Sequence, residues 1–444
     1  MTTLSKSNAM PAFTWHRLDM NYTDVELGDA LAATSQVVVE ADGALAGAGA
    51  LAGAGAAAGS AGDPAASGNA TSADAFDAAV AGLQAQVSAD AAAAPADTRA
   101  ILHAADGSED PSNLEVPALS AYEQRALTEE MANDVAAAFE CGMGQAAGDW
   151  FANQLAAAGA APIVLAAGKR QTGSATVRVN GADGAANVAC IDMVAAEGAT
   201  VNLTVSLDSP AAGAGVAAVQ VRVFAGEYSH VNVTSVHTLD EGYTALDNTG
   251  IVAAEGAHVT VTHRMLGAGK SYTGLACDLR RDTARVDIST RYLAGNQDVR
   301  DFNYVVRHRG RKTTSNIEAN GSLMGESKKT YRGTIDLVHG CKGSQGSENE
   351  TVLLVDEKVD NKTIPVILCD EDDVAGNHGA TIGHVAPDQM FYLKCRGLSQ
   401  AAAEGLFATA TLEETAIAID DAQVRAGIAR LAATAGIPYQ EVED

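Results

Sequence analysis

The residue best placed for metal chemistry lies near the C-terminus, in a segment reading DDVAGNHGATIGHVAPDQMFYLKCRGL over residues 372–398. His378 stands there between Gly376 and Gly379. Imidazole is a common ligand for transition metals. The two glycines let the backbone turn and leave the ring uncovered. A lone histidine in a turn is more often an ordinary polar surface residue, so on this basis His378 is only a candidate ligand.

A second candidate pair is His339 and Cys341, which stand two residues apart. In a β-strand their side chains would share one face and could bind one metal ion. The competing interpretation is that Cys341 is a small buried residue. The six cysteines have neither CxxC pairing nor regular spacing, so they predict no disulfide framework; they are Cys141, Cys190, Cys277, Cys341, Cys369 and Cys395. Cys369 ends an apolar run and is predicted to lie in the core.

Two further segments resemble ligand sites only superficially. Residues 321–330 (GSLMGESKKT) contain Gly, Ser and Lys but lack the order of a phosphate-binding P-loop. The basic residues at 307–312 could bind an anion. In a chain this acidic, a solvated turn or internal salt bridging explains them better.

Strands must position these residues, because the hydrophobic period changes from helical to alternating after Pro162. Three related segments start at Val194, Val223 and Val252, and their first residues are 29 apart in both steps. Such a period, with short Val- and Thr-rich strands, is typical of a solenoid whose coils bury apolar side chains by stacking. The sequence therefore predicts a mixed, mainly β protein with a right-handed parallel β-helix over residues 161–386.

Helical regions are predicted on both sides of this solenoid. Residues 1–160 are expected to form an N-terminal helical region, with apolar residues at helical spacing over 73–87 and 119–158 and a Gly/Ala-rich linker at about 41–72. Residues 387–444 are expected to form a C-terminal helical domain with a break near residues 411–413.

Charge and targeting signals restrict the environment and the partners. The formal net charge of −27 argues against nucleic acid or an anionic membrane as a partner, because both would be repelled. The uncharged run at 43–62 is almost wholly Gly and Ala, which gain too little on transfer into lipid to predict a membrane span. The N-terminus carries no apolar signal segment, and we expect a cytoplasmic protein.

Several motifs together resemble the SufB/SufD family of iron-sulfur cluster assembly scaffolds. Residues 372–398 are similar to the family's acidic pair, its His-Gly-Ala-Thr turn and its helix with Phe-Tyr-Leu and Arg-Gly. Four other segments look like family elements in the family's order: PAFTWHRLDMN at 11–21, VRHRGRKTTS at 306–315, YRGTIDL at 331–337 and SQGSENETVLL at 344–354. The resemblance covers residues 160–444 well and residues 24–155 poorly.

Departures from the family pattern indicate a SufD-like member. SufB-type members carry a cysteine after the Ser/Gln-containing strand and Glu after the closing His. Here residues 343–367 contain no cysteine, and Gly379 follows His378. SufD-type members often have a cysteine two residues before the His, whereas this chain has Gly376.

The resemblance implies a non-catalytic scaffold that holds a transient iron-sulfur cluster through His378 in a SufBCD-type complex. ATP hydrolysis is then expected in a SufC-type ABC ATPase. The residues expected to dock it are Phe391, Tyr392, Arg396, Leu398 and Leu406. The other expected partner is a SufB-type subunit, or a second copy of this chain in a homodimer.

Two other classes of function stay open on the sequence. A β-helix can be a carbohydrate-active enzyme, which needs convergent carboxylates. Residues 370–373 are all acidic, but they cluster at the end of a coil. The chain could also be a structural adaptor solenoid that binds no metal.

Overall fold

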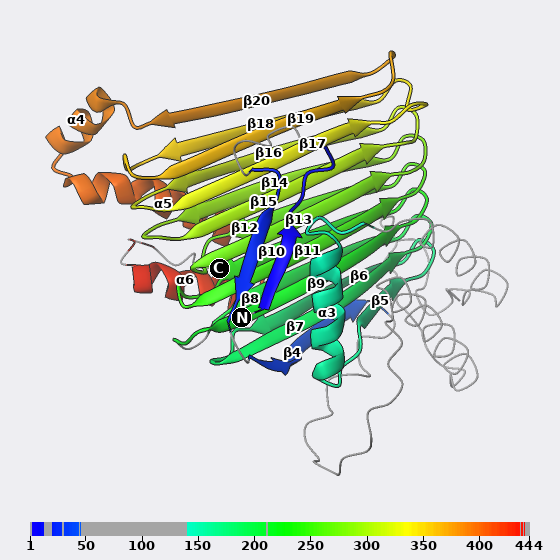
Figure 1. Cartoon of the computed structure of the whole chain (residues 1–444), viewed down its shortest axis with the longest axis horizontal. Helices are drawn as coiled ribbons and strands as arrows, with labels where there is room; N and C mark the ends of the chain where they lie inside the picture. The colour runs from blue at the N-terminus through cyan, green and yellow to red at the C-terminus, as the bar shows by residue number, and fades with distance from the viewer. Residues whose placement is uncertain are drawn as a thin grey trace, which may run out of the picture. The chain divides into compact units, whose positions relative to one another are not determined.

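Strands of the solenoid alternate along the chain between two parallel sheets, and each coil adds one strand to each sheet (Figure 1). In order, one sheet contains β20 (Ala375–His384), β18 (Gln345–Leu354), β16 (Thr314–Leu323), β14 (Arg285–Ala294), β12 (His258–Met265), β10 (His230–Thr238), β8 (Thr200–Asp208), β6 (Thr172–Asn180) and β4 (Val37–Gly43). The other contains β19 (Asp360–Cys369), β17 (Lys328–Leu337), β15 (Val299–His308), β13 (Lys270–Leu279), β11 (Tyr243–Ala253), β9 (Gly215–Ala225), β7 (Ala185–Ala195) and β3 (Ala32–Thr34), with β5 (Ile163–Ala167) also on β7. The predicted parallel β-helix is confirmed.

The computed structural model describes residues 2–12, 20–28, 31–43, 45, 140–209, 212–435, 437 and 439. They all belong to the unit formed by Met1–Ser60 and Glu140–Asp444, and the other unit, Ala61–Phe139, lies outside them. The predicted helix at 73–87, most of the one at 119–158, and nearly all of the linker also lie outside the described residues. Within them, no helix is long and apolar enough to cross a membrane.

In-register stacking places equivalent residues of successive coils in columns. Val201, Val231, Val259 and Val286 form one such inward column, and all four are fully buried. Coil length varies from 26 residues, between Thr244 and Lys270, to 32, between Lys328 and Asp360. For this reason the three repeats seen in the sequence are offset by one residue. Val194 and Val252 are each in register with Phe224, not with Val223.

The N-terminal part corrects one prediction, because the described residues of 2–43 include strands and no helix. β1 (Thr2–Ser7) and β2 (Thr23–Leu27) make an antiparallel pair. β4 pairs with β6 in the antiparallel direction and β3 pairs with β7, so both cover the first coil. Of the predicted N-terminal helices, the described residues include α3 (Gln145–Ala157).

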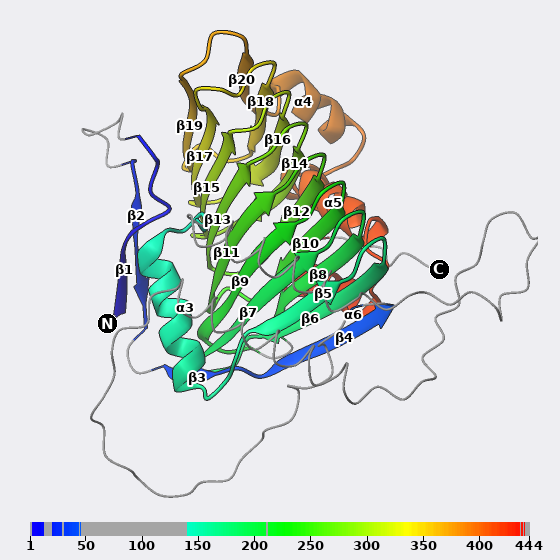
Figure 2. The same ribbon diagram turned by 90° about the vertical axis from the view of Figure 1, so that its right-hand side faces the viewer.

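Helices and strands cover the outer faces of both sheets (Figure 2). On one side, α3 and the β1–β2 pair pack on the sheet of β7 and β9 through Leu4, Val25, Trp150 and Phe151. On the other side, α5 (Gln400–Ile417) and α6 (Ala422–Ala435) bury Ala408, Leu412 and Ile428 against Val236, Leu266 and Leu293. The predicted break at 411–413 is wrong. α5 continues without interruption to Ile417, and Leu412 in its middle is fully buried.

A buried polar group lies in the interior of the middle coils. Asp247 accepts hydrogen bonds from Ser235 Oγ at 2.6 Å and Thr249 Oγ1 at 3.2 Å, and its Oδ2 lies 3.3 Å from His237 Nε2. Burial alone would raise the pKa of Asp247. The hydrogen bond with His237 and the nearby His263 outweigh burial, and the pKa lies below its ordinary value.

Two buried histidines make stability depend on pH. Burial lowers the pKa of His263 and of His308 from the ordinary 6.5 to about 4. The unfolded chain therefore binds more protons than the folded chain between pH 6.5 and pH 4, and stability falls as pH falls through that window.

We predict that each of these histidines costs about 2 kcal/mol of unfolding free energy when the pH drops from 7 to 4.5. His308→Gln should reduce this pH dependence by about that amount, as measured by urea denaturation at both pH values. His384→Gln, at an exposed site on β20, is the control and should not change it. An unchanged pH dependence in His308→Gln would contradict this account.

Candidate functional site

His378 lies on β20, the last strand of its sheet, and not in the predicted turn. Side chains at positions 376 and 378 point to the same face of a strand. A Cβ atom at Gly376 would lie 3.2 Å from Ile367 Cγ2 and 3.5 Å from Leu337 Cδ1, both inside the solenoid. His378 therefore faces the interior, yet it is exposed because, among the residues that the structure describes, no further strand covers β20.

The column that contains His378 changes character at its last two positions. Val261, Ile288 and Ile317 stack in register and are buried. The next two members are Glu348 on β18 and His378 on β20. Apolar side chains thus give way to a carboxylate and an imidazole where the solenoid opens to solvent.

Beside this column lies a buried ion pair between Lys329 and Glu350, whose side chains are 0% and 1% exposed. Glu350 also accepts hydrogen bonds from Thr363 Oγ1 at 2.6 Å and from Tyr292 OH at 3.2 Å. Lys329 Nζ contacts Thr363 Oγ1 at 3.1 Å. Burial lowers the pKa of Lys329, although the carboxylate of Glu350 opposes that shift. Both carboxylate oxygens of Glu350 therefore accept hydrogen bonds.

Glu348 differs from its neighbour because one of its carboxylate oxygens is buried without a hydrogen-bond partner in the described part of the chain. It is 1% exposed, and its Oε2 has no hydrogen-bond partner among the described residues. Burial, and then the nearby Glu350, raise the pKa of Glu348 to about 8, although Tyr331 and the charge of Lys329 oppose that shift. The carboxylate lies against Gly333, where a Cβ atom would be 2.1 Å from Oε1. Gly333 therefore provides the space that this carboxylate occupies.

Sequence reasoning missed this polar group, although a signal was present. Glu348 and Glu350 alternate in phase with Val352, and all three are buried. Alternation with a buried apolar residue indicates that the two glutamates face inward.

The prediction that His339 and Cys341 share one face is wrong, because both lie in the turn between β17 and β18. The His339 side chain is 83% exposed, whereas Cys341 is fully buried beside Ile335 and Leu337. Cys369 was expected in the core, but it is exposed at the end of β19. Within the described part of the chain, no three His, Cys, Asp or Glu side chains come together to hold a metal ion.

The acidic run at 370–373 forms the turn between β19 and β20. Glu371 Oε2 accepts a hydrogen bond from the backbone N–H of Gly340 at 2.9 Å. That bond holds the pKa of Glu371 below its ordinary value. The carboxylate of Glu371 therefore stabilises a turn, and the run does not provide the convergent pair that glycoside hydrolysis needs.

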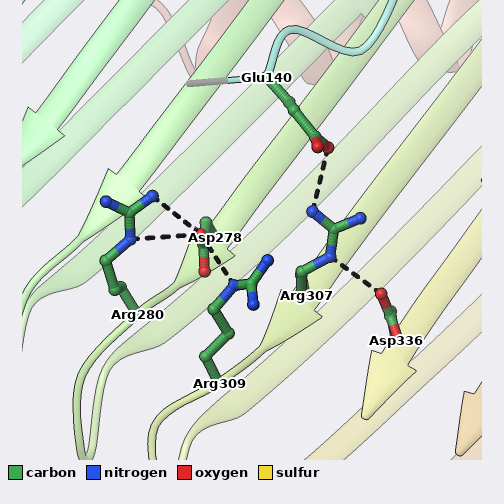
Figure 3. Close-up of polar contacts among 6 residues, drawn as sticks. All are labelled: Glu140, Asp278, Arg280, Arg307, Arg309 and Asp336. Carbon is green, nitrogen blue, oxygen red and sulfur yellow. Dashed lines mark hydrogen bonds and ion pairs between the residues drawn. The ribbon is translucent and has the colours of Figure 1, made fainter. Parts of the chain in front are cut away.

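Basic residues at 307–312 form internal ion pairs, as predicted (Figure 3). Arg307 donates to Asp336 at 2.9 Å and to Glu140 at 3.1 Å. Asp278 accepts from Arg309 at 3.2 Å and from Arg280 at 3.1 Å. The Arg307–Asp336 and Arg309–Asp278 pairs join neighbouring coils of one sheet.

The predicted docking residues lie mostly on α4 (Pro387–Cys395), which follows β20. Phe391 and Tyr392 are 68% and 55% exposed. The Arg396 guanidinium lies 4.9 Å from the centre of the Tyr392 ring, a cation–π distance. Leu398 follows α4 and is half-buried, and Leu406 is exposed on α5. A depression of about 480 Å³ beside Tyr392 is lined by Val385, Asp388, Gln389 and Leu393.

Comparison with known proteins places this architecture in a protein family. The family model described as "SUF system FeS cluster assembly, SufBD core domain" matches residues 177–411, which is more than half of the chain. The iron-sulfur cluster assembly protein SufD of Bacillus subtilis is 25% identical over 185 residues, covering 41% of this chain and 42% of the relative. A SufBD family protein of Mycobacterium tuberculosis is 26% identical over 180 residues, covering 40% and 21%. The chain thus matches less than half the length of either relative.

The close approach of Glu348 to Gly333 gives a testable consequence. Gly333→Ala should destabilise the protein by about 1–3 kcal/mol, because the new methyl group would overlap the carboxylate. The double variant Gly333→Ala with Glu348→Ala should lose much of that penalty, which denaturation of both variants would measure. Gly383→Ala on β20 is a matched control with open space around its Cβ position. An equal penalty with and without Glu348 would contradict this placement.

Proposed function

Because the chain belongs to the SufBD family of iron-sulfur cluster assembly proteins, we propose that it is a SufD-like scaffold subunit. In this proposal it works with a SufC-type ATPase and with a SufB-type subunit or a second copy of itself. The observation that carries the proposal is the position of His378, an inward-facing and exposed imidazole on the last strand of the solenoid.

The cluster is the cargo of this scaffold, and His378 is its proposed ligand. Imidazole binds iron readily, and cluster assembly requires a ligand that incoming iron and sulfide can reach. Within the described part of the chain, β20 also has an unpaired edge, because its sheet order ends at this strand. A partner strand can pair with such an edge and bring further ligands to His378.

The scaffold is proposed to be non-catalytic, with ATP hydrolysis in the partner. The sequence has a Gly-Lys-Ser run at residues 269–271, but Arg264 stands where a P-loop requires its first glycine, and Lys270 begins strand β13, so this run supports no P-loop. The proposed docking surface for the ATPase is α4 with Arg396, because Phe391 and Tyr392 expose large rings there. Aromatic residues and arginine are enriched at the energetic centres of protein interfaces.

A deletion from residue 400 onward is a poor test of docking. It would remove α5 and α6 and uncover Val236, Leu266 and Leu293 on the outer face of the sheet. Loss of such buried contacts destabilises the solenoid itself. Substitutions on the exposed face of α4 avoid this problem.

We therefore predict that the double variant Phe391→Ala and Tyr392→Ala loses co-purification with the SufC-type ATPase by at least about tenfold. Ile417→Ala is the control, because Ile417 is 69% exposed on another helix. Both proteins should melt like the wild type. Undiminished capture of the ATPase by the double variant would overturn the docking assignment.

His378→Ala should abolish most cluster formation in the assembled complex while costing about 1 kcal/mol or less of stability. Its neighbours Asn377 and Gly379 offer no replacement imidazole or thiolate ligand. The measurement is iron and acid-labile sulfide per complex purified without oxygen, with thermal melting as the folding control. Cys395→Ser, at an exposed position ending α4, should have no effect. Wild-type cluster content in His378→Ala would exclude this histidine as a ligand.

A further inference from the structure

Glu348 occupies a position where the fold by itself calls for an apolar side chain. The three preceding members of its column are Val261, Ile288 and Ile317, all fully buried. Burying a carboxylate with an unsatisfied oxygen is costly, whereas a leucine at this position would continue the packed core. Stability therefore does not explain this glutamate.

Local ion pairing does not explain it either. Lys329 is the buried cation nearby, and its ammonium group pairs with Glu350 and contacts Thr363. Glu350 has partners for both oxygens, while Oε2 of Glu348 has none among the residues that the structure describes. Buried polar atoms normally have hydrogen-bond partners, so an orphan atom of this kind needs a separate explanation.

The register of β18 and β20 indicates what the Glu348 side chain could bind. Glu348 and His378 are in register on neighbouring strands and point to the same interior face. Neighbouring strands are about 4.8 Å apart, a separation that lets a carboxylate and an imidazole reach one metal ion. Mixed carboxylate and imidazole ligands are typical of ferrous iron sites that keep open coordination positions.

We propose that Glu348 is a second ligand, together with His378, for ferrous iron at the open end of the solenoid. This inference rests on the proposed function and adds a residue to it. Two ligands from this chain leave the remaining coordination positions for water, sulfide or groups of a partner subunit. Gly333 belongs to the same arrangement, because any larger side chain there would displace the Glu348 carboxylate.

The test is iron binding by the full chain, purified without oxygen and freed of metal. Ferrous iron is titrated against a chromophoric chelator, and cobalt(II) serves as a spectroscopic probe of the ligands. Glu348→Gln should weaken iron binding by at least about tenfold and alter the cobalt spectrum. Glu318→Gln is the matched control, because it removes one carboxylate from an exposed site on neighbouring β16. It should bind iron like the wild type.

The variant Glu348→Leu distinguishes an effect on iron binding from an effect on folding. It should lose iron affinity as Glu348→Gln does, yet unfold at an equal or higher denaturant concentration, because it restores the apolar column. Wild-type iron affinity in Glu348→Gln, or a wild-type chain that binds no ferrous iron saturably, would overturn the proposal. If iron binding is lost in His378→Ala but kept in Glu348→Gln, then Glu348 is not a ligand. That result would leave the proposed scaffold function intact.

Discussion

A coil of this solenoid can bury its inward side chains only beneath the next coil, and the rest of the structure follows from that constraint. Successive strands stack in register, so that valines such as Val201 and Val231 form continuous columns. β4 closes the first coil by pairing with β6 in the antiparallel direction. At the other end β20 is the last strand of its sheet, and its inward face stays open. Because this inward face is open, His378 is accessible to solvent.

Two of the polar groups in the interior differ in how well their hydrogen bonds are satisfied. Asp247 in the middle coils is held by Ser235, Thr249 and His237, and its pKa lies below the ordinary value. Glu348 near the open end has one oxygen without a partner among the described residues. A satisfied network gives a unique core, whereas an unsatisfied group costs stability. That cost is consistent with a functional role near His378.

The outer surfaces also differ from one another, because some are covered or paired and one is exposed. Part of each outer sheet face is covered, one by α3 with the β1–β2 pair and the other by α5 and α6. Charged side chains such as Arg307 are paired with carboxylates of neighbouring elements (Figure 3). By contrast, α4 buries none of its residues and exposes Phe391 and Tyr392. An exposed aromatic pair beside an open strand edge is the feature that a partner protein would cover.

The sequence by itself determined the architecture, because alternation and a period near 29 residues are local properties of the chain. It also located His378 and the α4 segment, since short motifs carried the family resemblance. It did not determine the register of the strands. One extra residue in a coil places Phe224, and not Val223, opposite Val194. A one-residue shift exchanges the inner and outer faces of a strand.

Only the tertiary structure decided which polar residues meet. His339 and Cys341 are two apart in sequence, but a turn directs one to solvent and the other to the core. Glu348 and His378 are thirty positions apart, yet parallel pairing places them side by side on one inward face. Which residues share a column depends on the length of the intervening coil, and that length is fixed only when the turns fold and the strands pair.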